Sequence, residues 1–475
     1  MIVMNENSAM PGEGLFERVH STFQMLSILP EEISEDQLNE ILKLLPSGNI
    51  DAARFMLAPS RWEVSRTSLL SIYTWLEEAR SAKEEGRKVI LVPFNFPPEI
   101  IHAFENASPI TSEVMSTLAA GMLESGGEEY WDYAMGLGLP DHLCSGNTIE
   151  LASILAGADL KPDVIISATP GGCDVNAKIH EFVSNRINIP QLLLEKPTYD
   201  TNSRRGKEIY YKNFRRLVKN LEEITGETLK EENLRRVAEK ANQASELYYD
   251  LWELRKRRPS PIPGSSAFLA YGMRFSMWGR DEAVESMKKI LEVSIRNSKD
   301  GDYNAREEVA RLFWVYLPFY YDGYEYNEWL EMNDVANIGD ALLLFYPQVI
   351  DTSSYDSMME GFAESAWNMG MTRQMGAGSM SMQWTEDIIA AVKEFHIDFA
   401  IYCGHHSCKQ TWSAFTILRN EIKKRTGVPV LCLQGDSWIG RMTPMSAILD
   451  EMSLFLKNVV IPARKRKERS ESKEG

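Results

Sequence analysis

Short apolar runs alternate with amphipathic stretches along the first half of this chain. Residues 88–94, 163–167 and 189–194 are apolar almost throughout, as expected for strands that are buried on both faces of a sheet. Between these runs, residues 150–156 and 175–186 carry apolar side chains at helical spacing. Strands and helices that alternate in this way predict a parallel sheet with crossover helices.

The second half of the chain repeats this alternation. Apolar runs that are expected to form strands occupy residues 312–317, 341–345, 398–402 and 428–433, and residues 412–426 have helical spacing. The sequence therefore predicts an α/β protein with two doubly wound parallel-sheet domains of the flavodoxin or Rossmann kind.

Helical periodicity without strands marks two further regions. Apolar residues recur every three or four positions within residues 1–85, and again from Leu234 to Leu251. The predicted organisation is a helical N-terminal region at residues 1–85, an α/β domain at 86–200, a helical connector at 201–300, a second α/β domain at 301–462 and a charged tail at 463–475, which is expected to be disordered.

Composition narrows the class of function. The chain has 475 residues and a formal net charge of −17, which argues against a general nucleic-acid binder because such a protein needs a basic face. It has no run of about 18 apolar residues that would span a membrane, and its first residues lack the features of a signal peptide. Five widely spread cysteines do not form a disulfide framework, so a reducing, cytoplasmic location is expected.

Three cysteines stand at positions that favour metal binding. Cys173 and Cys408 each follow a predicted strand and a turn, and each precedes a predicted helix. This edge of an open α/β sheet is where ligands bind, and the helix dipole there favours the thiolate. Cys144 also precedes a predicted helix start. Three thiolates from two facing domains can enclose one metal centre in the cleft between them.

The residues alone leave other interpretations open. Cys432 lies inside an apolar run and is expected to pack as a small hydrophobic side chain, while Cys403 ends a predicted strand. Cys403 and Cys408, together with His405 and His406, can also be interpreted as a zinc site. The paired, closely spaced ligands of a zinc finger are missing, however.

At this point the motifs match a known family. The segments that carry the match occur in order and at fitting spacings: residues 96–104, 119–122, 136–146, 162–173, 188–190, 406–409 and 426–430, then Gly435, Asp436 and Arg441. On these segments the chain resembles the 2-hydroxyacyl-CoA dehydratase / benzoyl-CoA reductase family, and most closely its larger, alpha-type dehydratase subunits.

The resemblance implies a set of site residues. Cys144, Cys173 and Cys408 match the cysteines that hold a [4Fe–4S] cluster in the family, with one iron left open for another ligand. Glu113 corresponds to the acidic residue that follows the family's serine-rich turn, and His406 is the second candidate catalytic residue. The serine-rich turn itself is replaced here by Val-Pro-Phe-Asn at residues 92–95.

The resemblance also implies an activity and partners. The expected function is that of an (R)-2-hydroxyacyl-CoA dehydratase (a lyase), which removes water through a ketyl radical anion of a CoA thioester. The expected partners are a homologous smaller subunit with its own cluster and an ATP-dependent iron–sulfur activator. Two alternatives stay open: a benzoyl-CoA reductase-type subunit (an oxidoreductase), and an electron-relay or structural subunit whose partner holds the substrate.

Aromatic side chains are dense in residues 316–329. They can line a pocket for an acyl group, or they can pack beneath a loop, and the sequence favours packing.

Overall fold

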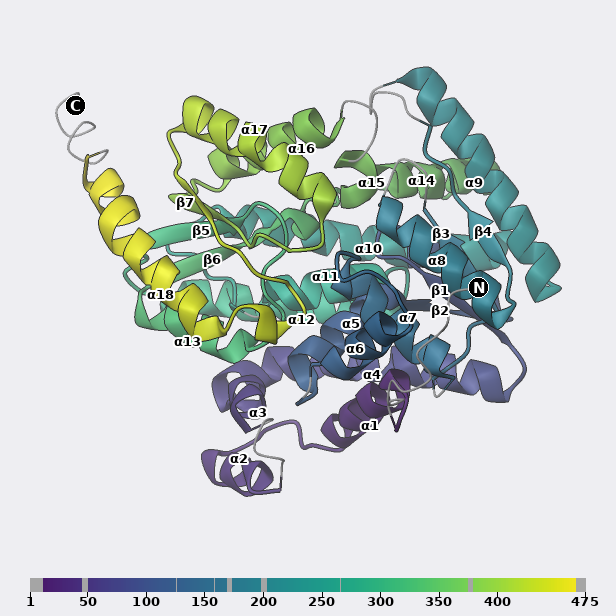
Figure 1. Ribbon diagram of the computed structural model, residues 1–475, viewed down its shortest axis with the longest axis horizontal. Coiled ribbons are helices and arrows are strands. Elements are labelled where there is room, and N and C mark those ends of the chain that lie inside the picture. The colour runs from purple at the N-terminus through teal and green to yellow at the C-terminus, as the bar shows by residue number, and fades with distance from the viewer. Residues whose placement is uncertain are drawn as a thin grey trace.

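Two parallel sheets form the framework of the protein (Figure 1). The computed structural model describes residues 12–44, 50–124, 126–157, 159–168, 173–197, 203–264, 266–374 and 379–466. Within these ranges each sheet has four strands. The first sheet has the order β2-β1-β3-β4, and it comprises β1 (Lys88–Val92), β2 (Ala107–Thr111), β3 (Val164–Ser167) and β4 (Gln191–Leu193).

The second sheet repeats the topology of the first. Its order is β6-β5-β7-β8, and it comprises β5 (Ala310–Trp314), β6 (Val335–Asp340), β7 (Phe399–Tyr402) and β8 (Val430–Cys432). In both sheets the second strand in the chain lies on one side of the first strand, and the third strand lies on its other side. This reversal is the topological switch point at which doubly wound sheets bind their ligands. The expectation of two doubly wound α/β units is confirmed.

Helices cover both sheets. The first sheet is accompanied by the 3₁₀ turn η2 (Pro98–Ala103) and by α5 (Ser112–Met122), α6 (Glu128–Gly136), α7 (Ser145–Ala156) and α8 (Asp174–Ile187). The second sheet is accompanied by the 3₁₀ turns η3 (Ala341–Leu343) and η4 (Gly440–Met442) and by α13 (Gly323–Met332), α14 (Tyr355–Asn368), α15 (Gly370–Gln374), α16 (Ser379–Glu394), α17 (Lys409–Thr426) and α18 (Met445–Phe455).

The two predicted helical regions are present. The N-terminal region comprises α1 (Leu15–Ser27), α2 (Glu35–Leu42), α3 (Ile50–Leu57) and α4 (Pro59–Glu84), which lie along the lower edge of the view in Figure 1. The connector comprises α9 (Arg204–Thr225), α10 (Glu231–Arg255), α11 (Ser266–Ser276) and α12 (Asp281–Asp300). Among the described helices, none combines the length and the apolar character that crossing a membrane requires.

The connector is a packing layer between the halves. Side chains of α9 and α10 share one buried cluster with the first sheet and with α14, which belongs to the second half of the chain. Arg274 of α11 also forms a fully buried ion pair of 2.8 Å with Glu99, and it donates a hydrogen bond of 3.1 Å to the hydroxyl of Ser365. These contacts hold the two sheets in one arrangement, so their carboxyl edges face a common interior.

Two strand predictions differ from the structure. Residues 341–345 were expected to form a strand, but residues 341–343 form the 3₁₀ turn η3, and the strand β6 lies directly before it. The buried Asp340 begins this turn by accepting a hydrogen bond of 2.7 Å from the backbone N–H of Leu342. A short apolar run shows burial but not conformation, which explains the wrong prediction. The strand β2 escaped prediction because it contains Pro109, which an edge strand tolerates.

The C-terminal segment is partly described. After α18, the π-helical turn Leu456–Val460 leads into helical residues 461–466, and Arg464 donates a hydrogen bond of 2.6 Å to the carbonyl oxygen of Glu308. The rest of the predicted disordered tail, residues 467–475, lies outside the described residues.

Candidate functional site

The three candidate cysteines share one local geometry. Cys144, Cys173 and Cys408 are the N-cap residues of α7, α8 and α17 respectively. The positive end of each helix dipole therefore lies next to a sulfur atom. At α8 the interaction is direct, because the Cys173 sulfur accepts a hydrogen bond of 3.5 Å from the backbone N–H of Asn176.

The three thiols line a single cavity at the facing edges of the two sheets. Phe94 and Cys173 follow β1 and β3, and Tyr316 and Cys408 follow β5 and β7, so both switch points contribute to the wall. Cys144 completes the set from the N-terminus of α7. The structure thus brings together thiols that are up to 264 positions apart, from Cys144 to Cys408.

The donor set fits a cluster better than a single ion. Within the described ranges, no three His, Cys, Asp or Glu side chains lie close enough together to hold one metal ion. Tetrahedral zinc would need sulfur ligands about 2.3 Å from one centre. A multi-iron cluster separates its ligands by its own width, so thiols that surround a cavity without meeting at one point fit such a cluster. The hydroxyl of Tyr316 also donates to the sulfur of Cys408 over 3.5 Å.

The two remaining cysteines are placed differently. Cys403 is fully buried, its sulfur lies 3.5 Å from the hydroxyl of Ser437, and burial raises the pKa of its thiol to about 11. Cys432 lies in β8, and burial raises the pKa of its thiol as well. Neither side chain lines the cysteine cavity. Within the described part of the chain, no group of three His, Cys, Asp or Glu ligands forms around Cys403 and Cys408.

Glu113 is the acidic group of the cysteine cavity. It is the second residue of α5 and is buried. Its carboxylate accepts hydrogen bonds from the backbone N–H of Phe94 at 3.0 Å, the hydroxyl of Ser112 at 2.7 Å and the amide of Asn176 at 3.3 Å. Burial outweighs these bonds and raises the pKa of Glu113 to about 7. A group that is half protonated near neutral pH can give and take a proton.

The two adjacent histidines lie in different environments. His406 is exposed and does not line the cavity; its backbone N–H donates to the carbonyl oxygen of Gly435 over 2.8 Å. His405 is fully buried, with its Nε2 3.5 Å from the sulfur of Cys144. The structure therefore brings Glu113 and the three cysteines together but leaves the side chain of His406 outside.

A backbone feature explains why His405 turns inward. Gly404 has a φ of +67°, and a Cβ at this position would lie 2.0 Å from the carbonyl oxygen of Leu433. The chain after β7 therefore passes directly against the segment after β8, and an isolated bridge joins His405 to Gly435. The sequence signal for this arrangement is the glycine before the histidine pair together with the later Gly435-Asp436 motif.

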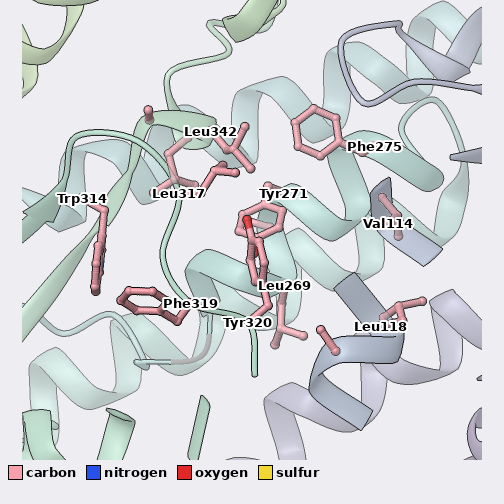
Figure 2. Close-up of a cluster of buried hydrophobic side chains, with 14 of the residues drawn as sticks. Val114, Leu118, Leu269, Tyr271, Phe275, Trp314, Leu317, Phe319, Tyr320 and Leu342 are labelled. Carbon is pink, nitrogen blue, oxygen red and sulfur yellow. The ribbon is translucent and has the colours of Figure 1, made fainter. Parts of the chain in front are cut away.

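A second, larger cavity lies beside the first. Its volume is about 440 Å³, against about 50 Å³ for the cysteine cavity. The two cavities have five lining residues in common: Thr117, Leu118, Tyr271, Tyr320 and Trp438. Figure 2 shows Tyr271 and Tyr320 in the middle of the view, with Leu118 and Leu269 nearby. The shared residues form a common wall, and sequence reasoning missed Tyr271 and Trp438 entirely.

The aromatic run at residues 316–329 both lines cavities and packs in the core. Tyr316, Leu317 and Tyr320 line the cysteine cavity, while residues 318–324 line the larger one. Most of these side chains are also buried in the core, where the indole N–H of Trp314 donates to the hydroxyl of Tyr326 over 2.8 Å. The pocket interpretation, which the sequence disfavoured, therefore gains support.

Comparison with known proteins agrees with this arrangement. The family model described as 2-hydroxyglutaryl-CoA dehydratase, D-component, matches residues 93–449. The (R)-phenyllactyl-CoA dehydratase alpha subunit of Clostridium sporogenes is 25% identical over 377 residues, which cover 75% of this chain and 86% of that protein. The lactoyl-CoA dehydratase subunit alpha of Anaerotignum propionicum is 20% identical over 385 residues, which cover 76% of this chain and 88% of that protein.

The matched range contains the second sheet and the strands β2, β3 and β4 of the first, together with Glu113, His405 and all three cavity cysteines. It covers well over half of the chain, and the two relatives carry dehydratase names, as the motifs predict. This chain belongs to the family of the 2-hydroxyglutaryl-CoA dehydratase D-component.

Proposed function

We propose that this chain is the alpha-type subunit of a 2-hydroxyacyl-CoA dehydratase, in which Cys144, Cys173 and Cys408 hold a [4Fe–4S] cluster. The observation that carries this proposal is the convergence of three helix-capping thiols on one cavity at the facing edges of two sheets. Both named relatives are dehydratase alpha subunits, which favours removal of water over ring reduction.

The chain's own residues would prepare the site for such a cluster. When bound, an iron–sulfur cluster with three cysteine ligands supplies one-electron transfer and an iron with an open position. The three helix N-termini stabilise negative charge on the thiolates, and the hydroxyl of Tyr316 donates to Cys408. The apolar wall around them excludes water, which strengthens these electrostatic interactions.

Glu113 would supply the proton for the leaving hydroxyl group. Loss of water from a 2-hydroxyacyl thioester requires a proton on the departing oxygen, and Glu113 lines the cavity with a pKa raised by burial to about 7. Its Oε2 accepts two hydrogen bonds of 3.0 Å or less, whereas its Oε1 accepts a longer one of 3.3 Å from Asn176. Oε1 is thus the oxygen that is more available to carry the proton.

The larger cavity favours a substrate held on this chain. Its volume of about 440 Å³ and its aromatic and aliphatic lining suit the side chain of an apolar or aromatic acyl group. It shares Tyr271, Tyr320 and Trp438 with the cysteine cavity, so an acyl group placed there would lie next to the cavity that holds Glu113. An electron-relay subunit would need no such cavity.

Two partners complete the proposal. The relatives are named as alpha subunits, which implies a further subunit, and we expect a smaller homologous chain with its own cluster. An ATP-hydrolysing iron–sulfur activator would deliver the single electron that dehydration through a ketyl radical anion requires.

Activity of the complex tests the proposal. The complex, purified without oxygen, would be mixed with activator, ATP and a panel of 2-hydroxyacyl-CoA thioesters of increasing side-chain size, with benzoyl-CoA in a parallel reaction. Formation of 2-enoyl-CoA from a 2-hydroxyacyl-CoA, without ring reduction of benzoyl-CoA, is the expected result. Ring reduction without dehydration would overturn the assignment.

A further inference from the structure

The thiol of Cys144 has a histidine neighbour from the other half of the chain. The Nε2 atom of His405 lies 3.5 Å from the Cys144 sulfur and 3.2 Å from the hydroxyl of Ser407. On the opposite side of the ring, Nδ1 lies 3.1 Å from Oδ2 of Asp436. His405 and Asp436 are both fully buried, so these contacts are shielded from water.

The surroundings of the ring favour a hydrogen on Nε2. The backbone N–H of Ser437 donates to Nδ1 over 3.3 Å in the neutral tautomer that has its hydrogen on Nε2. The carboxylate of Asp436, 3.1 Å from the same Nδ1, favours a hydrogen there as well, which gives the imidazolium with N–H groups on both nitrogens. In both of these forms the Nε2–H faces the sulfur, and a thiolate can only accept.

Asp436 connects His405 to the start of α7 in the other half of the chain. Asp436 accepts hydrogen bonds from the hydroxyl of Ser145, at 2.5 Å, and from the backbone N–H of Trp438, at 2.9 Å. Ser145 directly follows Cys144, so Asp436 holds both the histidine and the start of α7. The rings of His405 and Trp438 also meet edge to face, with centroids 5.1 Å apart.

We propose that His405, oriented by Asp436, is a positioning residue that donates a hydrogen bond to the Cys144 thiolate and thereby sets the reduction potential of the cluster. This inference rests on the proposed function. A hydrogen bond to a ligand sulfur withdraws electron density from the cluster and stabilises its reduced form, which raises the potential. Because Cys408 lies only three residues beyond His405, the same segment supplies one ligand and the donor to another.

The test is a redox titration of the complex, purified without oxygen and followed by electron paramagnetic resonance. His405→Leu is expected to retain the cluster and to lower its midpoint potential. A tenfold shift in the reduction equilibrium corresponds to about 59 mV for one electron. His405→Gln keeps an N–H donor and should restore most of the wild-type potential. His406→Leu, at the exposed neighbour, is the matched control and should leave the potential unchanged.

The outcomes separate this inference from the proposed function. An iron-free wild-type complex would refute both. A wild-type cluster whose potential is unchanged by His405→Leu, or is lowered as much by His405→Gln, would overturn the hydrogen-bond role alone. If His405→Leu loses its iron, Asp436→Asn provides the second measurement. Its expected shift is smaller and in the same direction, and an unchanged potential in that variant would equally contradict the role of the pair.

Discussion

The two α/β halves have the same strand order but contribute different chemistry to the site. In each half the helix after the third strand begins with a cysteine, Cys173 in the first and Cys408 in the second. Beyond this shared feature, the first half adds a further thiol, Cys144, and the acid Glu113. The second half adds hydrogen-bond donors, through His405 and the Tyr316 hydroxyl.

Two halves with one strand order can therefore place different functional side chains at their sheet edges. A doubly wound sheet provides a ligand-binding edge at its switch point but does not specify which side chains stand there. Here the proposed ligands and the proposed proton donor come mostly from one sheet edge, and the side chains that donate hydrogen bonds to the thiols come from the other. The site therefore depends on the seam between the halves, where Trp438 and His405 of the second half meet the start of α7 in the first half.

Removal of the Glu113 carboxyl group should have the largest effect on the rate of dehydration. Glu113→Gln preserves the shape of the buried side chain but cannot release a proton, so kcat should fall about 10²- to 10⁴-fold. The iron content should stay at the wild-type level, because Glu113 is not one of the cysteine ligands. Steady-state dehydration assays and iron analysis check both parts.

Glu181→Gln is the matched control for this substitution. Glu181 is exposed on α8 and is absent from the lining of both cavities. The Glu181→Gln variant should therefore keep most of the wild-type activity. Equal losses in the two variants would contradict the proton-donor role.

Filling the larger cavity should alter substrate choice. Leu269 is buried in the wall of this cavity, so Leu269→Trp reduces the space for a bulky acyl group. The ratio of kcat/KM for a large over a small 2-hydroxyacyl-CoA should fall by roughly 10- to 200-fold. Ile417→Trp, at a position that is 50% exposed, serves as the control and should leave the ratio unchanged. An unaltered ratio in Leu269→Trp would mean that the acyl group binds elsewhere.

The seam itself can be disturbed at a glycine. A Cβ at Gly146, near the start of α7, would lie 2.6 Å from the indole ring of Trp438 in the second half. Gly146→Ala should therefore lower the free energy of unfolding by about 1–3 kcal/mol. The control is Gly272→Ala in α11, where nothing lies within 4 Å and helix propensity favours alanine by roughly 0.5–1 kcal/mol. Thermal or denaturant unfolding measures both, and equal stability changes would show that the seam tolerates the methyl group.

The smallest expected effect concerns Glu150, a buried carboxyl group in α7. Burial raises the pKa of Glu150 well above its ordinary value of 4.5, and its Oε2 has no hydrogen-bond partner within the described structure. The folded state binds this proton more tightly than the unfolded state. The carboxyl therefore weakens folding as the pH rises above 4.5.

Glu150→Gln removes this titration. The variant should gain stability relative to the wild type as the pH rises, by roughly 1 kcal/mol near pH 8, and should gain none near pH 4. Denaturant unfolding at several pH values measures the difference. A gain that does not depend on pH would show that the pKa of Glu150 is the same in the folded and unfolded states, which would contradict the raised pKa.

Local patterns predicted much of the fold and part of the site. Strand runs followed by turns placed Cys173 and Cys408 at sheet edges, because parallel strands of a doubly wound sheet end on the same side. The same patterns missed β2, because it contains a proline, which is uncommon in strands. They also placed a strand on the apolar turn η3 instead of on β6, which lies directly before it.

The contacts between the halves were beyond sequence reasoning. The sequence alone does not show which of the two histidines, His405 or His406, points toward the cysteines. That placement depends on the packing of Gly404 against Leu433, and so on how β7 and β8 pair. Tyr271 and Trp438 likewise reach the cavity wall only through the docking of α11 and the segment after β8. Such placements follow from tertiary packing, and spacing along the chain does not encode them.

The central claim is that Cys144, Cys173 and Cys408 together hold one cluster. Iron and acid-labile sulfide, counted in the complex purified without oxygen, test it most directly. The account predicts that replacing these three residues with serine removes about four iron and four sulfide per chain, while Cys403→Ser combined with Cys432→Ser removes none. Unchanged iron in the triple variant, or loss of iron in the double variant, would contradict the account.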